Sequence, residues 1–411
     1  MGCGKIRKTT CLMLAGVLTL TALSSCAGEK KPDVTTTVTT TALTHIDILA
    51  ELPDVNEQIK KLNNVEGNIW INEDEKYKDI LGHLKSQIKD NVSVRGSIII
   101  ATDDDVLLAS GTRLKDREGK EVTPDTTYEI GSLTKSMTAV CIMKLAEEGK
   151  LSLTDTLGDY FAEFSSAPFY SKVSKVTVSN LLHMRSGIPD YVNDPENFWG
   201  LEKAALLAGK ESELGEKFCR FFAENADKAP EQAFCTEPNV EPDTKFEYSN
   251  TNYLLLAEII EKVSGKSYAE FMEETIFKPC GLTNTTAMKD GNVQASISKN
   301  AWYAPTCAAK GCGDVHSSVV DILKYNRALF GGYLLNKESM KELLEPIDNY
   351  ACGWEYLDKI VHHAGTTAGF STMDCMFTGK DGKRYYVIMC ANYGEECVFN
   401  LLVPMSGLSG A

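Results

Sequence analysis

Hydrophobic patterning divides the chain into strand-like ends and a helical middle. Two apolar segments, 94–102 (VRGSIIIAT) and 106–110 (VLLAS), flank three aspartates, Asp103 to Asp105, and are typical of a hairpin. Four more strands are predicted towards the C-terminus, at about 351–357, 359–364, 369–377 and 384–392. Strands at both ends with helices between them predict an α+β fold. The N- and C-terminal segments would build one antiparallel sheet flanked by helices, and the middle would form a mostly helical inserted domain.

Helical periodicity is clearest in residues 74–90, where one face carries Tyr77, Ile80, Leu81, Leu84 and Ile88. Another helix is expected to begin near Ser132 and to end near Gly149, because glycine is common directly after a helix. Further helices are predicted at about 200–226, 252–264, 266–277, 317–330 and 337–345. The folded domain is therefore expected to cover 74–403, with its sheet part at about 74–135 and 350–403 and its helical part at about 136–349. Residues 46–73 are weakly patterned and form an N-terminal extension of unknown role.

The first 26 residues have the parts of an export signal in the expected order. Lys5, Arg7 and Lys8 precede an apolar run of 13 residues that is too short to span a bilayer as a helix. Leu23-Ser24-Ser25-Cys26 then resembles the lipobox of bacterial lipoproteins, in which the cysteine is lipidated and becomes the first residue. We expect residues 1–25 to be a lipoprotein signal peptide, and a plain cleaved signal peptide with a chance cysteine is the alternative.

The segment after Cys26 reads as a tether. Six of the seven positions from 35 to 41 are threonine, and no apolar pattern is present for a core. Residues 26–45 are therefore assigned to a lipidated cysteine and a threonine-rich tether. The protein is expected on the outer face of the cell membrane as a lipoprotein, or secreted, with the lipid anchor as its contact with the membrane.

Charge and composition limit the possible partners. The chain of 411 residues has a net charge of −15 and a globular composition with 43% hydrophobic residues. An acidic surface argues against nucleic acid as a partner, since phosphate binding needs clustered positive charge. Neither a C-x-x-C pair nor an H-E-x-x-H motif occurs, so no metal and no cofactor is expected. We expect a monomer that acts on a small-molecule or peptide substrate.

Ten cysteines lie beyond Cys26, an even number that permits disulfides in an exported protein. Cys219–Cys235 and Cys307–Cys312 are possible local pairs. Many of the others lie inside apolar runs, as Cys141 does in MTAVCIMKLA, and there we favour buried free thiols.

The motif Ser132-Leu133-Thr134-Lys135 is the first candidate for chemistry. An S-x-x-K tetrad is weak by itself, because roughly two are expected by chance in a chain of this length, and Ser86–Lys89 and Ser296–Lys299 also match. Ser132 is set apart because it follows strand residues and Gly131 and opens a helix, at the positive end of the helix dipole. A lysine one turn along the same face can reach the hydroxyl and act as its base if burial lowers the lysine pKa. A plain helix N-cap is the alternative role for this serine.

Two later motifs carry complementary groups. Tyr248-Ser249-Asn250 supplies a phenol for proton transfer and an amide that can hold the lysine and a substrate carbonyl. It is preferred to the second Y-x-N motif, which begins at Tyr191, because residues 250–252 are expected to cap the following helix.

His363-Ala364-Gly365-Thr366 lies on a predicted strand near the C-terminus. Gly365 would let a substrate lie close against this strand. The Thr366 N–H could complete an oxyanion hole with that of Ser132. A surface strand histidine is the alternative for His363.

The order S-x-x-K, Y-x-N, H-x-G resembles the serine β-lactamase and penicillin-binding-protein superfamily. The resemblance is to the branch of class C β-lactamases, D-alanyl-D-alanine carboxypeptidases and esterases. It extends over about residues 75–400 and includes VTVSNLLHMRSGIPDY, FEYSNTNYLLLAEIIEKVSG and VHHAGTTAGF. It implies Ser132 as acylated nucleophile, Lys135 and Tyr248 as proton-transfer pair, Asn250 as substrate-positioning residue, and His363, Gly365 and Thr366 on the substrate-binding strand.

Two positions depart from the family pattern. Met184 stands where a histidine is usual in the stretch LLTHTSG, and His363 stands where a typical β-lactamase has lysine. Lysine would hold a substrate carboxylate as a permanent cation, whereas histidine is mostly neutral at pH 7. The sequence therefore predicts an exported serine hydrolase for amide or ester carbonyls, such as D-amino-acid peptides, β-lactams or esters. A penicillin-binding sensor that is acylated but barely turns over is the alternative.

Overall fold

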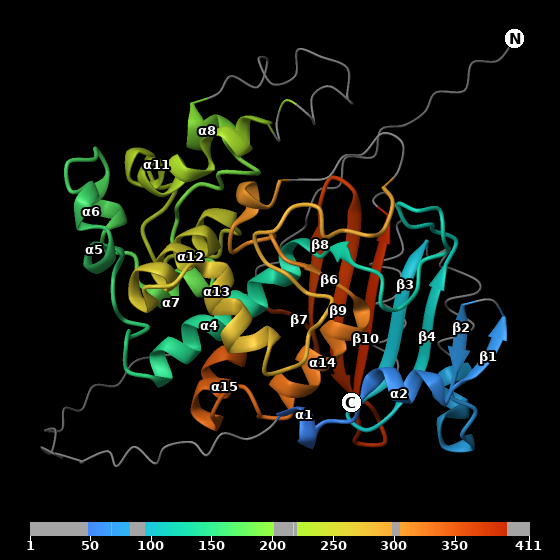
Figure 1. Ribbon diagram of the computed structural model, residues 1–411. Helices are drawn as coiled ribbons and strands as arrows, with labels where there is room; N and C mark the ends of the chain where they lie inside the picture. Colours follow the sequence, from blue (N-terminus) through green and yellow to red (C-terminus); the bar gives the residue numbers. More distant parts are fainter. Residues whose placement is uncertain are drawn as a thin grey trace, which may run out of the picture. The chain divides into compact units, whose positions relative to one another are not determined.

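The polypeptide builds one antiparallel sheet from its two ends (Figure 1). In this computed structural model, the described residues are 48–66, 68–82, 95–200, 217, 220–297 and 305–392. The sheet order is β1-β2-β4-β3-β10-β9-β8-β7, so β3 from the N-terminal part pairs with β10 from the C-terminal part. The bounds of the strands are β1 Asn63–Glu66, β2 Ile69–Ile71, β3 Gly96–Thr102, β4 Val106–Thr112, β7 Glu355–Leu357, β8 Ile360–Thr366, β9 Phe370–Thr378 and β10 Arg384–Asn392.

Most of the helices lie between these two groups of strands in sequence, whereas the first two along the chain precede β1. The longer ones are α4 (Thr134–Glu147), α12 (Asn250–Ser264), α14 (Val319–Phe330) and α15 (Lys337–Leu344). The shorter α-helices are α1 (Ile48–Glu51), α2 (Val55–Lys60), α5 (Leu157–Tyr160), α6 (Tyr170–Val173), α7 (Val178–Leu182), α8 (Pro195–Trp199), α11 (Ala229–Cys235) and α13 (Tyr268–Met272). The 3₁₀ turns are η1 (Glu75–Tyr77), η2 (Gly131–Leu133), η3 (Ala162–Phe164), η4 (Ala226–Lys228) and η6 (Thr306–Ala309), and η5 (Glu273–Phe277) is a π-helix. The predicted α+β fold is confirmed.

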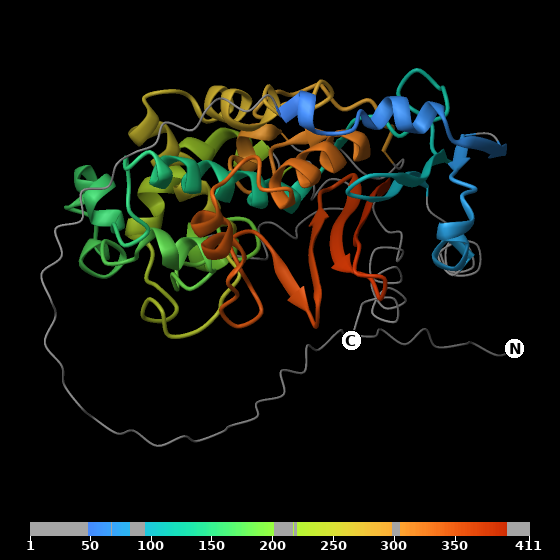
Figure 2. The same cartoon turned by 90° about the horizontal axis from the view of Figure 1, so that it is seen from below.

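Alternation of side chains gives the sheet two apolar faces. On β3, Ile99 and Ala101 belong to the larger core with the helices, whereas Ile98 and Ile100 belong to a second cluster with Tyr77. Helices α2 and α14 lie on the same face of the sheet (Figure 2). Because both faces are apolar, such a strand appears in the sequence as an unbroken apolar run, and this run is what could be recognised.

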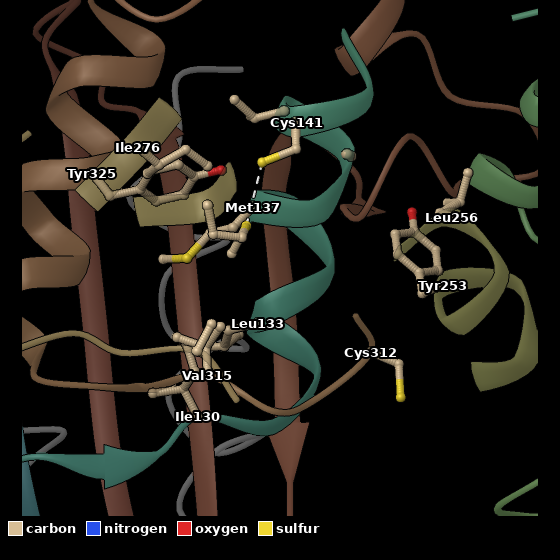
Figure 3. Close-up of a cluster of buried hydrophobic side chains, with 14 of the residues drawn as sticks. Ile130, Leu133, Met137, Cys141, Tyr253, Leu256, Ile276, Cys312, Val315 and Tyr325 are labelled. Carbon is tan, nitrogen blue, oxygen red and sulfur yellow. Dashed lines mark hydrogen bonds between the residues drawn. The ribbon is translucent and has the colours of Figure 1, made fainter. Parts of the chain in front are cut away.

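Helix α4 passes through the middle of the larger core. Most of its residues are buried, so it lacks a polar face of the kind that a surface helix has. Met137 and Cys141 lie on its side towards Tyr325 and Ile276, whereas Tyr253 and Leu256 lie on the other side (Figure 3). A helix packed on all sides keeps its first turn fixed. This turn carries Lys135, and η2, which directly precedes it, carries Ser132.

The weakly patterned extension is part of the folded unit. Strand β2 pairs with β4 and thus widens the sheet, and α2 packs on α14. Buried Arg327 donates to the carbonyl oxygen of Thr102 at 2.8 Å and to Gln58 Oε1 on α2 at 2.9 Å. Helices α1 and α2 and strand β2 have three to six residues with one buried residue each, so residues 46–73 carry no periodicity that the sequence could reveal.

The cysteines form no disulfide among the residues that the structure describes. Cys307 and Cys312 are both free thiols, so the proposed local pair between them is wrong. Cys235 is also free, and its suggested partner at position 219 lies outside the described residues, as do the signal peptide, Cys26 and the tether. Cys141 and five others are buried free thiols, as favoured from the sequence.

Candidate active site

Ser132 lies where the sheet meets the central helix. It follows the short strand β5 (Tyr128–Glu129) and occupies η2, directly before α4 begins at Thr134. Gly131 has φ of 55°, and a Cβ there would lie 3.1 Å from the backbone nitrogen of Thr366. Glycine is thus favoured on both grounds, and the tight turn brings Ser132 beside β8. The N-cap of α4 is Leu133, so Ser132 does not serve as the simple cap considered above.

The Lys135 ammonium group is completely buried and fully hydrogen-bonded. Its Nζ donates to Ser132 Oγ at 2.9 Å, to Asn250 Oδ1 at 2.8 Å and to the carbonyl oxygen of Cys312 at 2.8 Å. An ammonium has three N–H donors, so these three acceptors satisfy it. The ring of Tyr248 also lies 5.0 Å from Nζ, within range of cation-π attraction. The cation is therefore held in one position beside the serine hydroxyl.

Tyr248 reaches the same serine oxygen. Its phenol donates to Ser132 Oγ at 2.9 Å. Burial raises the pKa of Tyr248, while the Lys135 cation acts in the opposite direction. Tyr248 is therefore a phenol at neutral pH, and Ser132 Oγ accepts one hydrogen bond from each of its two neighbours.

Asn250 is fixed by Asp190, a residue that the sequence interpretation missed. Asp190 Oδ2 accepts from the Asn250 side-chain amide at 2.9 Å and from its backbone N–H at 3.1 Å. Its Oδ1 accepts from the backbone N–H groups of Val192 and Asn193 at 2.8 and 3.0 Å. Because its amide nitrogen is bound to Asp190, Asn250 presents its carbonyl oxygen to Lys135.

The start of α12 corrects one sequence prediction. Residues 250–252 do not cap this helix: they form its first turn, and Ser249 is the N-cap without a side-chain hydrogen bond. The side chains of this turn bind across to residues 186–190 instead, with Thr251 Oγ1 donating to the Pro189 carbonyl oxygen at 2.7 Å. Tyr248 is therefore held by the contact of α12 with the loop after α7.

The strand that carries the histidine motif has one open edge. Strand β8 pairs with β9 from Val361 to Thr366, but with β7 only from Ile360 to His362. No strand within the described ranges pairs with the other edge of residues 363–366. An extended substrate would find unpaired backbone there, beside Ser132.

A match to a known family now explains this arrangement. The family model described as Beta-lactamase matches residues 85–394. The chain belongs to the Beta-lactamase family. Penicillin-binding protein 4* of Bacillus subtilis (strain 168) is similar to it, with 26% identity over 314 residues that cover 68% of this chain and 64% of that protein. The matched part is thus slightly less than two thirds of this relative's length.

Solved structures share the fold of this Beta-lactamase family member. FmtA from Staphylococcus aureus superposes with a TM-score of 0.61 at 21% identity, over 90% of this chain and 95% of that one. The D-amino acid amidase from Ochrobactrum anthropi SV3 superposes with a TM-score of 0.60 at 21% identity, over 80% of this chain and 99% of that one. At these identities the likeness concerns the fold.

His363, one of the two departures from the family pattern, is buried and not a surface histidine. Its side chain is 2% exposed, with Nδ1 2.8 Å from the Ala364 carbonyl oxygen and Nε2 3.4 Å from Tyr350 Oη. Burial and the nearby Lys135 cation lower the pKa of His363 to about 3. It is therefore neutral, unlike the lysine usual at this position.

Packing within the protein requires a glycine at position 365. A Cβ at this position would lie 2.1 Å from the Ile130 carbonyl oxygen and 2.3 Å from Thr372 Oγ1. The residue thus lets β8 approach η2, while close approach of a substrate to this strand stays a prediction. Thr366 is the exposed last residue of β8, next to Gly131.

Met184, the other departure, supports the site from behind. Its sulfur accepts from the backbone N–H of Ser249 at 3.4 Å and from the Asn252 amide at 3.5 Å. Sulfur is a weak acceptor, so the methionine contributes mainly packing to the start of α12.

The other S-x-x-K and Y-x-N motifs are not part of this site. Ser296 Oγ donates to the Lys115 carbonyl oxygen, while Lys299 and the tetrad at 86–89 lie outside the described residues. Tyr191 is buried and donates to the Ala308 carbonyl oxygen at 2.7 Å.

Across the described residues there is no group of three or more His, Cys, Asp or Glu side chains that could hold a metal. Within the same ranges, every helix is too short or too polar to cross a membrane.

Proposed function

We propose that this protein is a serine hydrolase that transfers the acyl part of an amide or ester to Ser132 and then to water. The observation that carries the proposal is the position of Ser132 Oγ, 2.9 Å from both Lys135 Nζ and Tyr248 Oη. A serine hydroxyl needs a base within hydrogen-bond reach before it can attack a carbonyl. Two groups that can exchange protons, Lys135 and Tyr248, lie within this distance of Ser132 Oγ.

Acylation requires one proton fewer than the resting arrangement holds. In the structure both neighbours of Ser132 Oγ donate hydrogen bonds to it, so neither can accept its proton. Loss of one proton from the Lys135–Tyr248 pair turns one of them into an acceptor. Ser132 Oγ then bonds to the substrate carbonyl carbon, its proton passes to the pair, and the pair returns a proton to the departing amine or alcohol. Water then attacks the resulting ester. The pair accepts a proton from the water, and a proton is returned to Ser132 Oγ as the acid leaves.

The developing oxyanion would be held by backbone donors. The proposed donors are the N–H groups of Ser132 and Thr366, whose segments are brought together by Gly131 and Gly365. Fixed N–H donors stabilise the transition state because they need no reorganisation during the reaction. Asn250 would position the substrate near its carbonyl group. The open edge of β8 would hold the substrate backbone.

Candidate substrates come from the family and its structural neighbours. They are D-amino-acid peptides and amides, β-lactams and small esters. Relatives named as penicillin-binding proteins and as a D-amino acid amidase support this range. A sensor that is acylated without turnover would use the same first step.

A hydrolysis panel tests the proposal. Nitrocefin, a D-Ala-D-Ala peptide, a D-amino-acid amide and a p-nitrophenyl ester would be assayed with the wild type and Ser132→Ala. Steady turnover that Ser132→Ala abolishes supports the hydrolase, and a burst of one equivalent without turnover supports the sensor. Turnover that survives Ser132→Ala would contradict both.

Export and anchoring are also part of the proposal. The charged start, the apolar run and Cys26 support a lipoprotein on the outer face of the cell membrane. Metabolic labelling with a fatty acid would mark the wild type and not Cys26→Ala. Equal labelling of both, or of neither, would contradict the anchor.

A further inference from the structure

An acidic residue, Glu355, lies at one end of the open edge of β8. Glu355 begins β7 and lies opposite His362, the last residue of β8 that β7 pairs. The next residue, His363, begins the unpaired edge. The Glu355 side chain is 38% exposed, and its two oxygens lie 3.9 Å from His362 Nδ1 and 4.0 Å from His363 Nε2. Glu355 is therefore placed to meet a substrate that runs along the edge.

Neither histidine can neutralise this acid. The pKa of His363 is lowered to about 3, and burial also lowers that of His362. In the described part of the chain, Glu355 has no Lys or Arg partner within 4.0 Å. Lys135 makes no hydrogen bond to Glu355 and affects it only by electrostatic attraction, which lowers the pKa of Glu355. All three N–H donors of Lys135 are bound to other acceptors.

The charge at this end of the site is thus opposite to that of a typical family member. Where a lysine would hold a substrate carboxylate, this chain has a neutral histidine and an adjacent acid. Burial raises the pKa of Glu355, which means that its charged form lacks solvation. A cation brought by the substrate would supply the missing stabilisation, whereas a carboxylate would be repelled.

We propose that Glu355 selects substrates that carry an ammonium group, in place of a carboxylate, at the end lying against His363. The selected class is an amide or ester whose far end is an amine several bonds from the scissile carbonyl. Thr366 and His363 are three residues apart on β8, so that separation is on the order of 10 Å. This inference rests on the proposed function, because it names the substrate class of the same site.

A matched series of peptides tests the proposal. One N-acetylated D-Ala-D-Ala peptide is extended by three groups of similar length: glycine with its free carboxylate, glycinamide and the 2-aminoethyl amide. Each is tested for protection of Ser132 against a fluorophosphonate label, and kcat/KM is measured wherever turnover occurs. Protection reports binding even for a peptide that is not cleaved.

The wild type is expected to favour the ammonium end over the carboxylate end by at least about 10-fold, less so at high salt. Glu355→Gln should reduce this preference to within about 3-fold, with the protection by each peptide expressed relative to the variant's own rate of fluorophosphonate labelling. Asp358→Asn, which removes a carboxylate at the β7–β8 turn, is the matched control and should keep the wild-type preference.

Three results would overturn the inference: a wild-type preference for the carboxylate, protection by none of the peptides, or an equal effect of Glu355→Gln on all three. If Ser132 is labelled in each of these cases, the proposed hydrolase survives and only the role of Glu355 fails. If Ser132 is never labelled, the proposed function itself fails.

Discussion

The surroundings of Ser132 and the open edge of β8 differ in how completely their polar groups are paired. Lys135 has an acceptor for each of its three donors, and Asn250 is held through both its amide nitrogen and its backbone N–H. At the edge, the buried Nδ1 of His362 has no hydrogen-bond partner in the described structure, and Glu355 faces two neutral histidines.

This contrast separates reaction from selection. A saturated buried network permits one arrangement of its members, which is what a proton-transfer site needs. An edge with unpaired groups gains stability when a ligand supplies the missing partner. Changes in the network should therefore affect all substrates, whereas changes at the edge should affect some substrates and not others.

The largest effect is expected for Lys135→Met. The variant keeps an unbranched side chain but removes the ammonium and its bond to Ser132 Oγ. We expect kcat/KM to fall on the order of 10³-fold for every substrate, because residues that act as a unit with the nucleophile cannot be replaced singly. Steady-state kinetics measure the loss. A loss confined to one class of substrate would contradict the separation drawn above.

Tyr248→Phe should have the next largest effect. The phenol is lost and the ring remains, so kcat/KM is expected to fall about 10²-fold. Because the raised pKa of Tyr248 keeps its phenol protonated in the free site, wild-type activity should rise with pH as the phenol loses its proton. A kcat/KM profile from pH 6 to pH 10 should lose or shift this rise in the variant. An unchanged profile would show that Tyr248 takes no part in proton transfer.

Asp190→Asn should have a smaller effect, through positioning. The new amide would set an N–H donor against the Asn250 amide, which now donates to Asp190 Oδ2 at 2.9 Å. Asn250 would then turn away from Lys135, and kcat is expected to fall about 10-fold with KM changed less. Kinetics and thermal unfolding should be measured together. If the melting temperature falls and kcat does not, the role of Asp190 is only structural.

Asp374→Asn should leave activity unchanged and alter stability. Burial raises the pKa of Asp374 to about 7, and its Oδ1 accepts from the Asn326 amide at 2.7 Å. Its unfolded pKa is about 4, so the folded state holds an extra proton between these values, and wild-type stability is lost as pH rises from about 4 to 7. Urea unfolding at pH 4, 6 and 8 measures the free energy of unfolding. Between pH 4 and pH 8 this free energy should fall by up to about 4 kcal/mol less in Asp374→Asn than in the wild type. Identical pH dependence in both proteins would contradict the assignment.

Local patterns predicted much of this molecule. The strands at 98–101 and 384–392 face an apolar core on each side and therefore appear in the sequence as apolar runs. Ser132 and Lys135 are one helical turn apart, which is also visible in the sequence. The spacing from Ser132 to Tyr248 carries no such information. It was interpreted through family resemblance, and the structure brings the two side chains into contact.

The remaining features depend on contacts between distant segments. Asp190 lies in a loop without periodicity, and only the packing of that loop on α12 brings it to Asn250. The Cys312 group that binds Lys135 is a backbone carbonyl, which every residue possesses. Glu355 gains its position from the register of β7 on β8, and this register cannot be read from a strand of three residues.

The central claim is that Ser132 is a nucleophile activated by its two neighbours. The most direct measurement is mass spectrometry of the intact protein and its peptides after brief exposure to a fluorophosphonate. The account predicts one added group per chain, located on Ser132, with slower labelling in Lys135→Met and none in Ser132→Ala. Labelling at another residue, or equal labelling of Ser132→Ala, would contradict it.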